Sequence, residues 1–513
     1  MEINKEREMS LQQRQLVDHY FDEGQYDMGI STLNGLRDPR WLPSPFGAIP
    51  TIPFMVNVLK TLCICRQHIR QLVYLALYPP PDPSELASNE KENEIPEATK
   101  LGFKVHKEVH VPNPAATIAA QDILMEFAAT NTPAGLLRGL PKYVERNSEE
   151  DVIVGEDDED SFISKKAKCF RHSKNCWEIL RDGFVKHHKE EVAQKRGRGR
   201  PRRRPGGDDE DEDGSVGYQS AVGENAWPVL QWLLAIFERD ERLTIASENL
   251  QYSSVLLSQV PPPRMGSGGR WDVEGPLNVI CASVSQDQER RKLCGPRLLT
   301  LLINLTNSTH MDMKMFINVT NNRLFTLPFE ELEYLLDNLH ESAPVKRFKL
   351  NFYCTYLSQE CSIGRSVDRP RPVRRAKPVS ARSKSGTSTG VSTPTLTSNP
   401  SSGASTPAVA LRFPPPSTGE VARLLTAPPS PNETNPQVSI LQVMEVKSHL
   451  VQTYVALQPH GWEPMFGNGE FAQVVMEAFN LRVGQGGEEA QKAADRYKKF
   501  FQARLAILKP VSS

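Results

Sequence analysis

The stretch Trp227-Pro228-Val229-Leu230-Gln231-Trp232-Leu233-Leu234-Ala235-Ile236-Phe237 decides the fold class. It is almost entirely apolar. Pro228 is typical of the first turn of a helix, because the N–H groups of that turn have no partner within the helix and proline lacks this group. The stretch therefore predicts the opening helix of a helical domain, which we assign to residues 217–365.

Further short apolar segments follow within the same block. Polar loops separate them, and each is long enough for two or three helical turns: 277–284, 294–305, 329–339 and 348–357. Successive short helices of this kind suggest stacking as in armadillo or HEAT proteins. No clean internal repeat accompanies them, so a compact irregular bundle is the alternative.

The residues before this block also favour helices, and we assign 1–146 as an N-terminal helical region. Apolar spacing predicts a helix over 9–34 that Gly24 and Gly29 interrupt. The segment 54–78 predicts a helix that is apolar on most sides and hence buried, ended by Pro79-Pro80-Pro81. A further helix is expected over 115–130.

The C-terminal part alternates between two compositions. Residues 366–438 are rich in Ser, Thr, Pro and Arg, and we expect them to be disordered. Residues 439–510 return to helical periodicity, and about seventy residues form a small core alone, so we expect them to dock on 217–365. The fold class that results is mainly α, with helical blocks, either armadillo/HEAT-like or irregular, separated by long disordered linkers.

Overall composition narrows the class of protein. The 513 residues carry a formal net charge of −1, but basic and acidic residues are segregated into separate runs, so local charge is the informative quantity. No apolar run is long enough for a transmembrane helix, the polar N-terminus is unlike a secretory signal, and eight cysteines are sparse. We therefore expect reduced thiols, an intracellular protein, no membrane partner and, given the basic runs, a location in the nucleus.

Residues 147–216 form a linker with strong charge alternation. Acidic runs at 149–160 and 208–213 bracket a basic amphipathic segment, 162–189, and a second basic run, 195–205. The acidic runs could compete with DNA for the basic run or attract histones; the simpler interpretation is a solvated linker.

The run at 195–205 points to a particular ligand. Seven of its eleven residues are cationic, and its glycines and prolines keep it out of helix and strand. The narrow minor groove of A·T-rich DNA favours inserted arginine, and Gly199, with no Cβ, lets the backbone approach the groove floor. Pro201 keeps the chain extended. The predicted DNA-contacting residues are Lys195, Arg196, Arg198, Gly199, Arg200, Pro201, Arg202, Arg203 and Arg204.

The core Arg198-Gly199-Arg200-Pro201 resembles the AT-hook, a short minor-groove-binding motif, over about ten residues. The resemblance implies a chromatin-remodelling or transcription-regulating assembly, in which A·T-rich double-stranded DNA and protein subunits of a nuclear complex are the partners. The alternative is a basic run that serves only as a nuclear import signal. A further basic cluster at 369–384 is interpreted as a second import signal or a tail that contacts phosphates.

Two groups of cysteine and histidine have spacings that suggest metal ligands. Cys169, His172 and Cys176, with His187 and His188 downstream, have ligand types suited to zinc, although a second paired motif is missing. In the group Cys63, Cys65 and His68, the thiols fall on the apolar 54–78 segment, so we interpret them as buried. We predict no cofactor.

No nucleotide-binding loop, nucleophile elbow, zinc-protease or kinase signature is present in the sequence. We therefore predict a non-enzymatic chromatin-associated scaffold. A helical-repeat adaptor whose basic runs are import signals is the alternative, and an enzyme of unrecognised type is the third.

Overall fold

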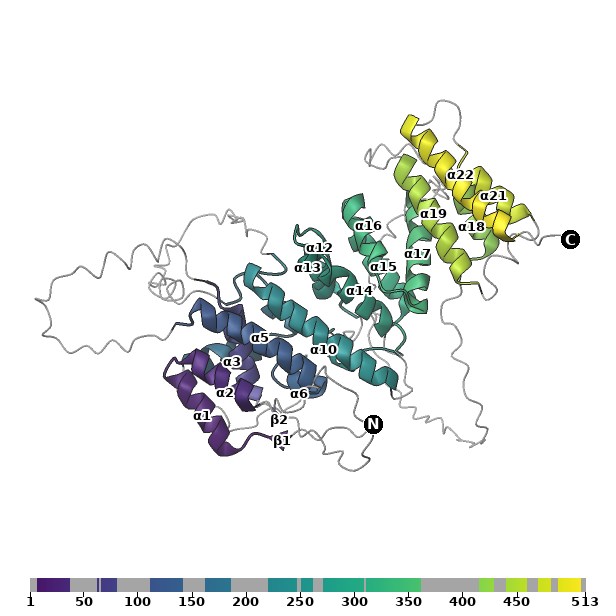
Figure 1. Ribbon diagram of the computed structural model, residues 1–513. Helices are drawn as coiled ribbons and strands as arrows, with labels where there is room; N and C mark the ends of the chain where they lie inside the picture. The colour runs from purple at the N-terminus through teal and green to yellow at the C-terminus, as the bar shows by residue number, and fades with distance from the viewer. Residues whose placement is uncertain are drawn as a thin grey trace, which may run out of the picture. The chain divides into compact units, whose positions relative to one another are not determined.

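The computed structural model describes thirteen stretches of the chain: 7–36, 62–63, 66–80, 111–141, 162–185, 220–246, 251–261, 271–308, 311–360, 415–428, 440–458, 469–480 and 488–508. Most of these residues are helical, which confirms the predicted mainly α class (Figure 1). Two compact units are present, Met1–Phe348 and Lys349–Ser513, and the division falls within one helix, α17 (Ala343–Glu360). Within the described ranges, no helix is both long enough and apolar enough to cross a membrane.

The first unit begins with a helical hairpin. Ser10 caps α1 (Leu11–Asp22) in a reciprocal capping box with Gln13, and Gly24, at φ 71°, makes the turn into α2 (Tyr26–Leu36). The predicted interruption at Gly24 is thus confirmed. The one at Gly29 is wrong, because Gly29 lies inside α2, where a Cβ would meet the Phe21 ring at 2.5 Å. This glycine allows the two helices to approach closely.

The predicted helix over 54–78 is also wrong at its start. Residues 54–61 lie outside the described residues, β2 (Leu62–Cys63) pairs in parallel with β1 (Arg7–Glu8), and α3 begins only at Arg66 and runs to Leu77. A continuous apolar run does not distinguish a buried strand from a buried helix, which explains the error. The C-terminal half of the segment is the buried helix expected.

The core of the first unit forms around α10 (Trp227–Ala246), the helix that the opening stretch predicts. It contacts α3, α5 (Pro114–Thr130), α6 (Pro133–Leu137) and α14 (Cys294–Leu305), and Figure 1 shows α5 and α10 side by side. Trp232 and Phe237 are both fully buried. The N-terminal helices and the 227–246 helix therefore share one core.

Three predicted apolar segments of this unit are helices in the structure: α12 (Glu274–Val284), α14 and α16 (Phe329–Asp337). The described residues also form α11 (Ser254–Leu257) and α13 (Glu289–Lys292), which match no predicted segment, and α15 (Met313–Leu324). The sequence did not predict α15, because polar residues interrupt its apolar side, although Asp312 caps its first turn by accepting from the Met315 N–H at 2.9 Å. Arg297 on α14 forms two hydrogen bonds to the Glu238 carboxylate on α10, at 2.6 and 2.9 Å.

The described part of the second unit contains the end of α17 and the helices α18 (Thr418–Thr426), α19 (Ile440–Ala456), α21 (Glu470–Ala478) and α22 (Glu488–Leu508). The prediction of disorder across 366–438 is wrong for α18. Its Val421, Leu424 and Leu425 are buried, and the buried Lys447 ammonium of α19 donates to the Leu425 carbonyl at 2.6 Å. The surrounding Ser, Thr and Pro residues obscured this short amphipathic helix.

Candidate nucleic-acid interface

The predicted DNA-contacting residues, Lys195 to Arg204, lie outside the described residues. The structure does describe the chain on both sides of them, at 162–185 and from 220 onward. The upstream side is the predicted basic amphipathic segment, which forms three short pieces: α7 (Phe162–Ala167), the 3-10 helix η3 (Lys168–His172) and α8 (Cys176–Ile179).

Aromatic and aliphatic side chains anchor this segment to the first unit. Phe170, Trp177 and Leu180 are buried, and the Phe170 ring stacks on Phe184 with centroids 5.5 Å apart. The indole N–H of Trp177 donates to the Gln259 carbonyl at 3.1 Å, and its ring lies 6.2 Å from that of Phe237 on α10. The segment is therefore a fixed part of the helical core.

Gln259 joins three parts of the chain at this anchor. Its side-chain oxygen accepts from the Cys176 backbone N–H at 2.9 Å, and its NH₂ group donates to the Pro141 carbonyl at 2.9 Å. Gln259 is fully buried, so each of these bonds satisfies a group that water cannot reach. Apolar spacing within one segment does not predict a glutamine that bridges distant segments, and Gln259 was therefore not predicted from the sequence.

The chain just before residue 186 and the chain just after residue 219 are held together by backbone hydrogen bonds. The Asp182 N–H donates to the Ser220 carbonyl at 3.1 Å, and the Gly223 N–H donates to the Leu180 carbonyl at 2.8 Å. A Cβ on Gly223 would come within 3.1 Å of the Asp182 Cα, so a glycine permits this approach. The described chain before residue 186 is therefore joined to the described chain after residue 219 within the first unit.

The described cations of the basic segment lie on α7, on η3 and in the turn that follows η3. Lys165 and Lys174 are exposed, the Lys166 ammonium lies 5.6 Å from the Phe162 ring centroid, and Lys168 and Arg171 project from η3. The segment before residue 186 therefore contains several basic residues within a part of the chain that is fixed to the core. Positive charge of this kind attracts polyanions at long range.

The cysteines and histidines that the sequence suggested as zinc ligands, from Cys169 to His188, are only partly described by the structure. Cys176 is fully buried and burial raises its pKa well above the usual value; burial likewise raises the pKa of Cys169 to about 11. Both groups are thus neutral thiols at pH 7 as they stand. The His172 side chain, His187 and His188 lie outside the described residues. In the other group, His68 hydrogen-bonds the Asp18 carboxylate at 2.8 Å.

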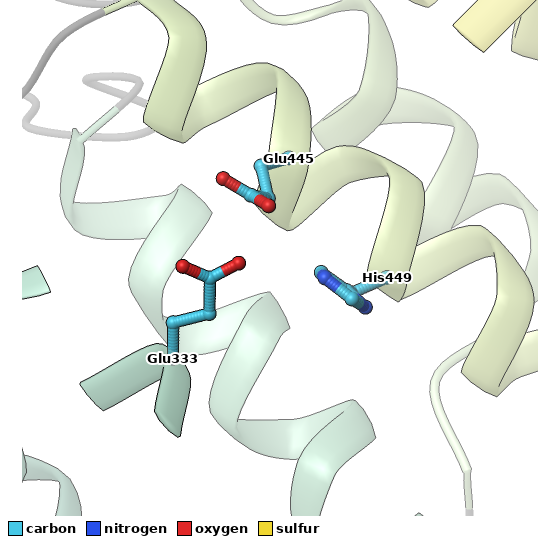
Figure 2. Close-up of side chains that lie close together, drawn as sticks. All are labelled: Glu333, Glu445 and His449. Carbon is cyan, nitrogen blue, oxygen red and sulfur yellow. The ribbon is translucent and has the colours of Figure 1, made fainter. Parts of the chain in front are cut away.

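One pair of metal-binding residue types lies outside the predicted sites. Glu445 and His449 are one turn apart on α19 (Figure 2), and the His449 ring stacks on Tyr353 with centroids 5.8 Å apart. Glu333, also labelled in Figure 2, belongs to the first unit. Two ligands on one helix leave most of a metal's coordination shell unfilled, and we assign no site to them.

Comparison of the chain with protein-family models, with curated proteins and with solved structures finds no match.

Proposed function

We propose that this protein is a nuclear, chromatin-associated scaffold, a subunit of a chromatin-remodelling or transcription-regulating complex, that tethers the complex to A·T-rich DNA. The observation that carries the proposal is the cationic run at 195–205, with its core Arg198-Gly199-Arg200-Pro201. Its chemistry suits a narrow, electronegative minor groove, where extended backbone can reach the floor and arginines can lie along it.

The contacts on either side of the run support a tether. The bonds between Asp182 and Ser220 and between Leu180 and Gly223 fix the chain to the helical unit both before and after the run, so DNA bound by the run would be connected to that unit. The flanking cations of the basic segment then raise the local attraction for phosphate. A short groove-binding motif binds DNA weakly by itself. When the same protein makes a second contact with the same DNA, the effective concentration of the motif near the duplex rises, and so does the overall affinity.

The helical units supply the protein-binding part of this function. On α5, Ile118 and Met125 expose 59% and 41% of their surface two turns apart, which is apolar area suited to a partner protein. Histones are candidate partners for the acidic runs at 149–160 and 208–213. The alternative function is an adaptor in which the basic runs act only as import signals.

A gel-shift comparison tests the proposal. The full chain and its Arg198→Ala/Arg200→Ala variant are titrated with A·T-rich and G·C-rich duplexes of equal length. We expect the variant to lose about tenfold or more in affinity for the A·T-rich duplex and to lose its preference between the two, since each well-placed arginine contributes about 1–3 kcal/mol of discrimination.

The Arg203→Ala/Arg204→Ala variant is the charge-matched control. It removes the same charge but leaves the core intact, so we expect weaker binding to both duplexes with the A·T preference retained. The slope of log affinity against log salt should fall by about 0.9 for each phosphate that the variant no longer neutralises. Equal affinity of the native chain for the two duplexes would contradict minor-groove binding. Loss of nuclear accumulation with unchanged DNA binding would favour the import alternative.

A further inference from the structure

The helix α22, in the second unit, has two halves of different charge. Its first half carries three carboxylates and one lysine, and that lysine, Lys492, pairs with Glu488 at 2.6 Å. From Arg496 to Leu508 the helix contains no carboxylate. This second half carries four cations: Arg496, Lys498, Lys499 and Arg504.

These four cations have no counter-charge of their own. None of them forms a salt bridge within the part of the chain that the structure describes. The helix dipole does not account for them either, because its attraction for cations falls off within the last turn. Arg496 lies about three turns before the end of the helix at Leu508. Their charge is therefore available to an anionic partner.

Three of the cations lie on one side of the helix. Arg496, Lys499 and Arg504 are spaced with Phe500 and Ala503 at i, i+3, i+4, i+7 and i+8, which places all five residues on one helical face. All five are exposed, and Phe500 exposes 37% of its surface. We call these five residues the basic face of α22.

The other side of α22 fixes the helix to the second unit. Phe501 is fully buried, and its ring stacks on that of Phe479 with centroids 5.5 Å apart. The Tyr497 ring lies 5.3 Å from the same Phe479 ring. The basic face is thus carried by a helix that aromatic packing holds in place.

Aromatic rings also orient the two arginines. The Arg496 guanidinium lies 5.3 Å from the Tyr497 ring centroid, and the Arg504 guanidinium lies 5.7 Å from that of Phe500. A guanidinium that lies over a ring keeps the N–H donors at its edge, where they can bind the oxygens of a phosphate in pairs. Less side-chain freedom is then lost on binding than for an unsupported lysine.

The density of the positive charge favours duplex DNA as the partner. Arg496 and Arg504 are eight residues apart, or about 12 Å along the helix axis. Duplex DNA carries one negative charge for about every 1.7 Å of its axis, so a face of this length meets a continuous row of phosphates. An extended acidic peptide carries at most one carboxylate for about every 3.3 Å.

A membrane surface fits the face less well. An interfacial helix buries a broad apolar side among the lipids, whereas the apolar side of α22 is packed within the unit through Phe501. The basic face offers one large apolar side chain, Phe500, and its ring is next to the Arg504 guanidinium. Charge, not apolar area, is what this surface presents.

We propose that the basic face of α22 binds the phosphate backbone of duplex DNA without reading its sequence. The choice of DNA as the polyanion rests on the proposed function, whereas the face itself is independent of the run at 195–205. A phosphate contact supplies affinity and no base discrimination. The second unit then adds to the DNA affinity of the chain, and the A·T preference comes from the run.

The full chain and its Arg496→Gln/Arg504→Gln variant test the proposal by gel shift on A·T-rich and G·C-rich duplexes. The control, Arg290→Gln/Arg423→Gln, removes two exposed arginines from α13 and α18. We expect the Arg496/Arg504 variant to lose about tenfold in affinity for both duplexes at 0.1 M salt, with a fall of up to about 1.8 in the salt slope. The control should bind DNA as the native chain does.

Equal affinity and an equal salt slope for the Arg496/Arg504 variant and the control would overturn the proposal. So would a loss of binding to vesicles of anionic phosphatidylserine with unchanged DNA affinity, since the partner would then be a membrane surface. Circular dichroism verifies that both variants are folded. If the Arg496/Arg504 variant is not, Lys499→Gln replaces it, with an expected fall of about 0.9 in the slope.

The same substitutions in the Arg198→Ala/Arg200→Ala background separate this proposal from the function of the run. We expect the combined variant to bind both duplexes more weakly than the Arg198/Arg200 variant alone. If the Arg198/Arg200 substitution leaves A·T preference unchanged while the Arg496/Arg504 substitution lowers affinity, minor-groove binding by the run fails and the basic face stands. The reverse result removes the face and leaves the run.

Discussion

Two basic stretches lie next to each other in this chain and behave differently as sequences. The segment at 162–185 interleaves its lysines and arginines with Phe170, Trp177 and Leu180, and these residues fasten it to the helical core. The run at 195–205 interleaves its arginines with glycine and proline, which offer little or no side chain to bury. Apolar spacing, not charge, therefore supplies the side chains by which a basic stretch can join a core.

The largest expected effect on folding comes from the anchor of the first stretch. Trp177→Ala removes a side chain that is 3% exposed, together with its hydrogen bond to Gln259. We expect the free energy of unfolding of the first unit to fall by about 3–5 kcal/mol. Denaturant titration measures the loss.

Phe184→Ala is the matched control for Trp177→Ala, because Phe184 is aromatic, lies in the same segment and is only half-buried. We expect a loss of about 1–2 kcal/mol from it. If Trp177→Ala lowers the free energy of unfolding by no more than Phe184→Ala does, Trp177 does not anchor the basic segment to the core, and the contrast drawn between the two basic stretches is weakened.

A smaller loss is expected at the bridge beneath the anchor. Gln259→Leu leaves the Cys176 N–H and the Pro141 carbonyl without the partners that they have in the native chain. Two unsatisfied buried groups of this kind cost together about 2–4 kcal/mol.

The control for this substitution is Gln288→Leu, at an exposed position where the side chain forms no capping bond, and we expect a change within about 0.5 kcal/mol. Urea unfolding of both variants under one buffer makes the comparison. Similar values for the two would show that water replaces the Gln259 bonds, and that the segment is held by its aromatic side chains alone.

The helical core could be predicted to a large extent from apolar spacing. The predicted 294–305 segment is α14 (Cys294–Leu305), and the predicted opening stretch lies in α10. Those segments are apolar enough that burial in a helix is the dominant local preference. The α15 helix was missed because its polar positions weaken that preference, and α18 because a short amphipathic helix is obscured by prolines around it.

The candidate site was predictable only in part. The cations of 162–185 and their apolar partners are visible in the sequence, since residue type and spacing are local properties. The backbone bonds that join Asp182 to Ser220 and Leu180 to Gly223 depend on residues far apart in the chain. Contacts across such separations follow from tertiary packing, for which one sequence has no local signal.

The smallest expected effect on folding is at the second stretch. Because the 195–205 run has no large apolar side chain to bury, Arg198→Ala/Arg200→Ala should change the free energy of unfolding by less than about 0.5 kcal/mol, as for substitutions away from a core. The same variant is expected to abolish A·T preference, so it should change DNA binding without changing the stability of the fold. Denaturant titration beside the gel shift measures both. A loss of more than about 1 kcal/mol would mean that the run packs on the helical unit, because an exposed arginine contributes little to stability. The contrast between the two basic stretches would then fail, and the loss of DNA affinity would have to be attributed to folding.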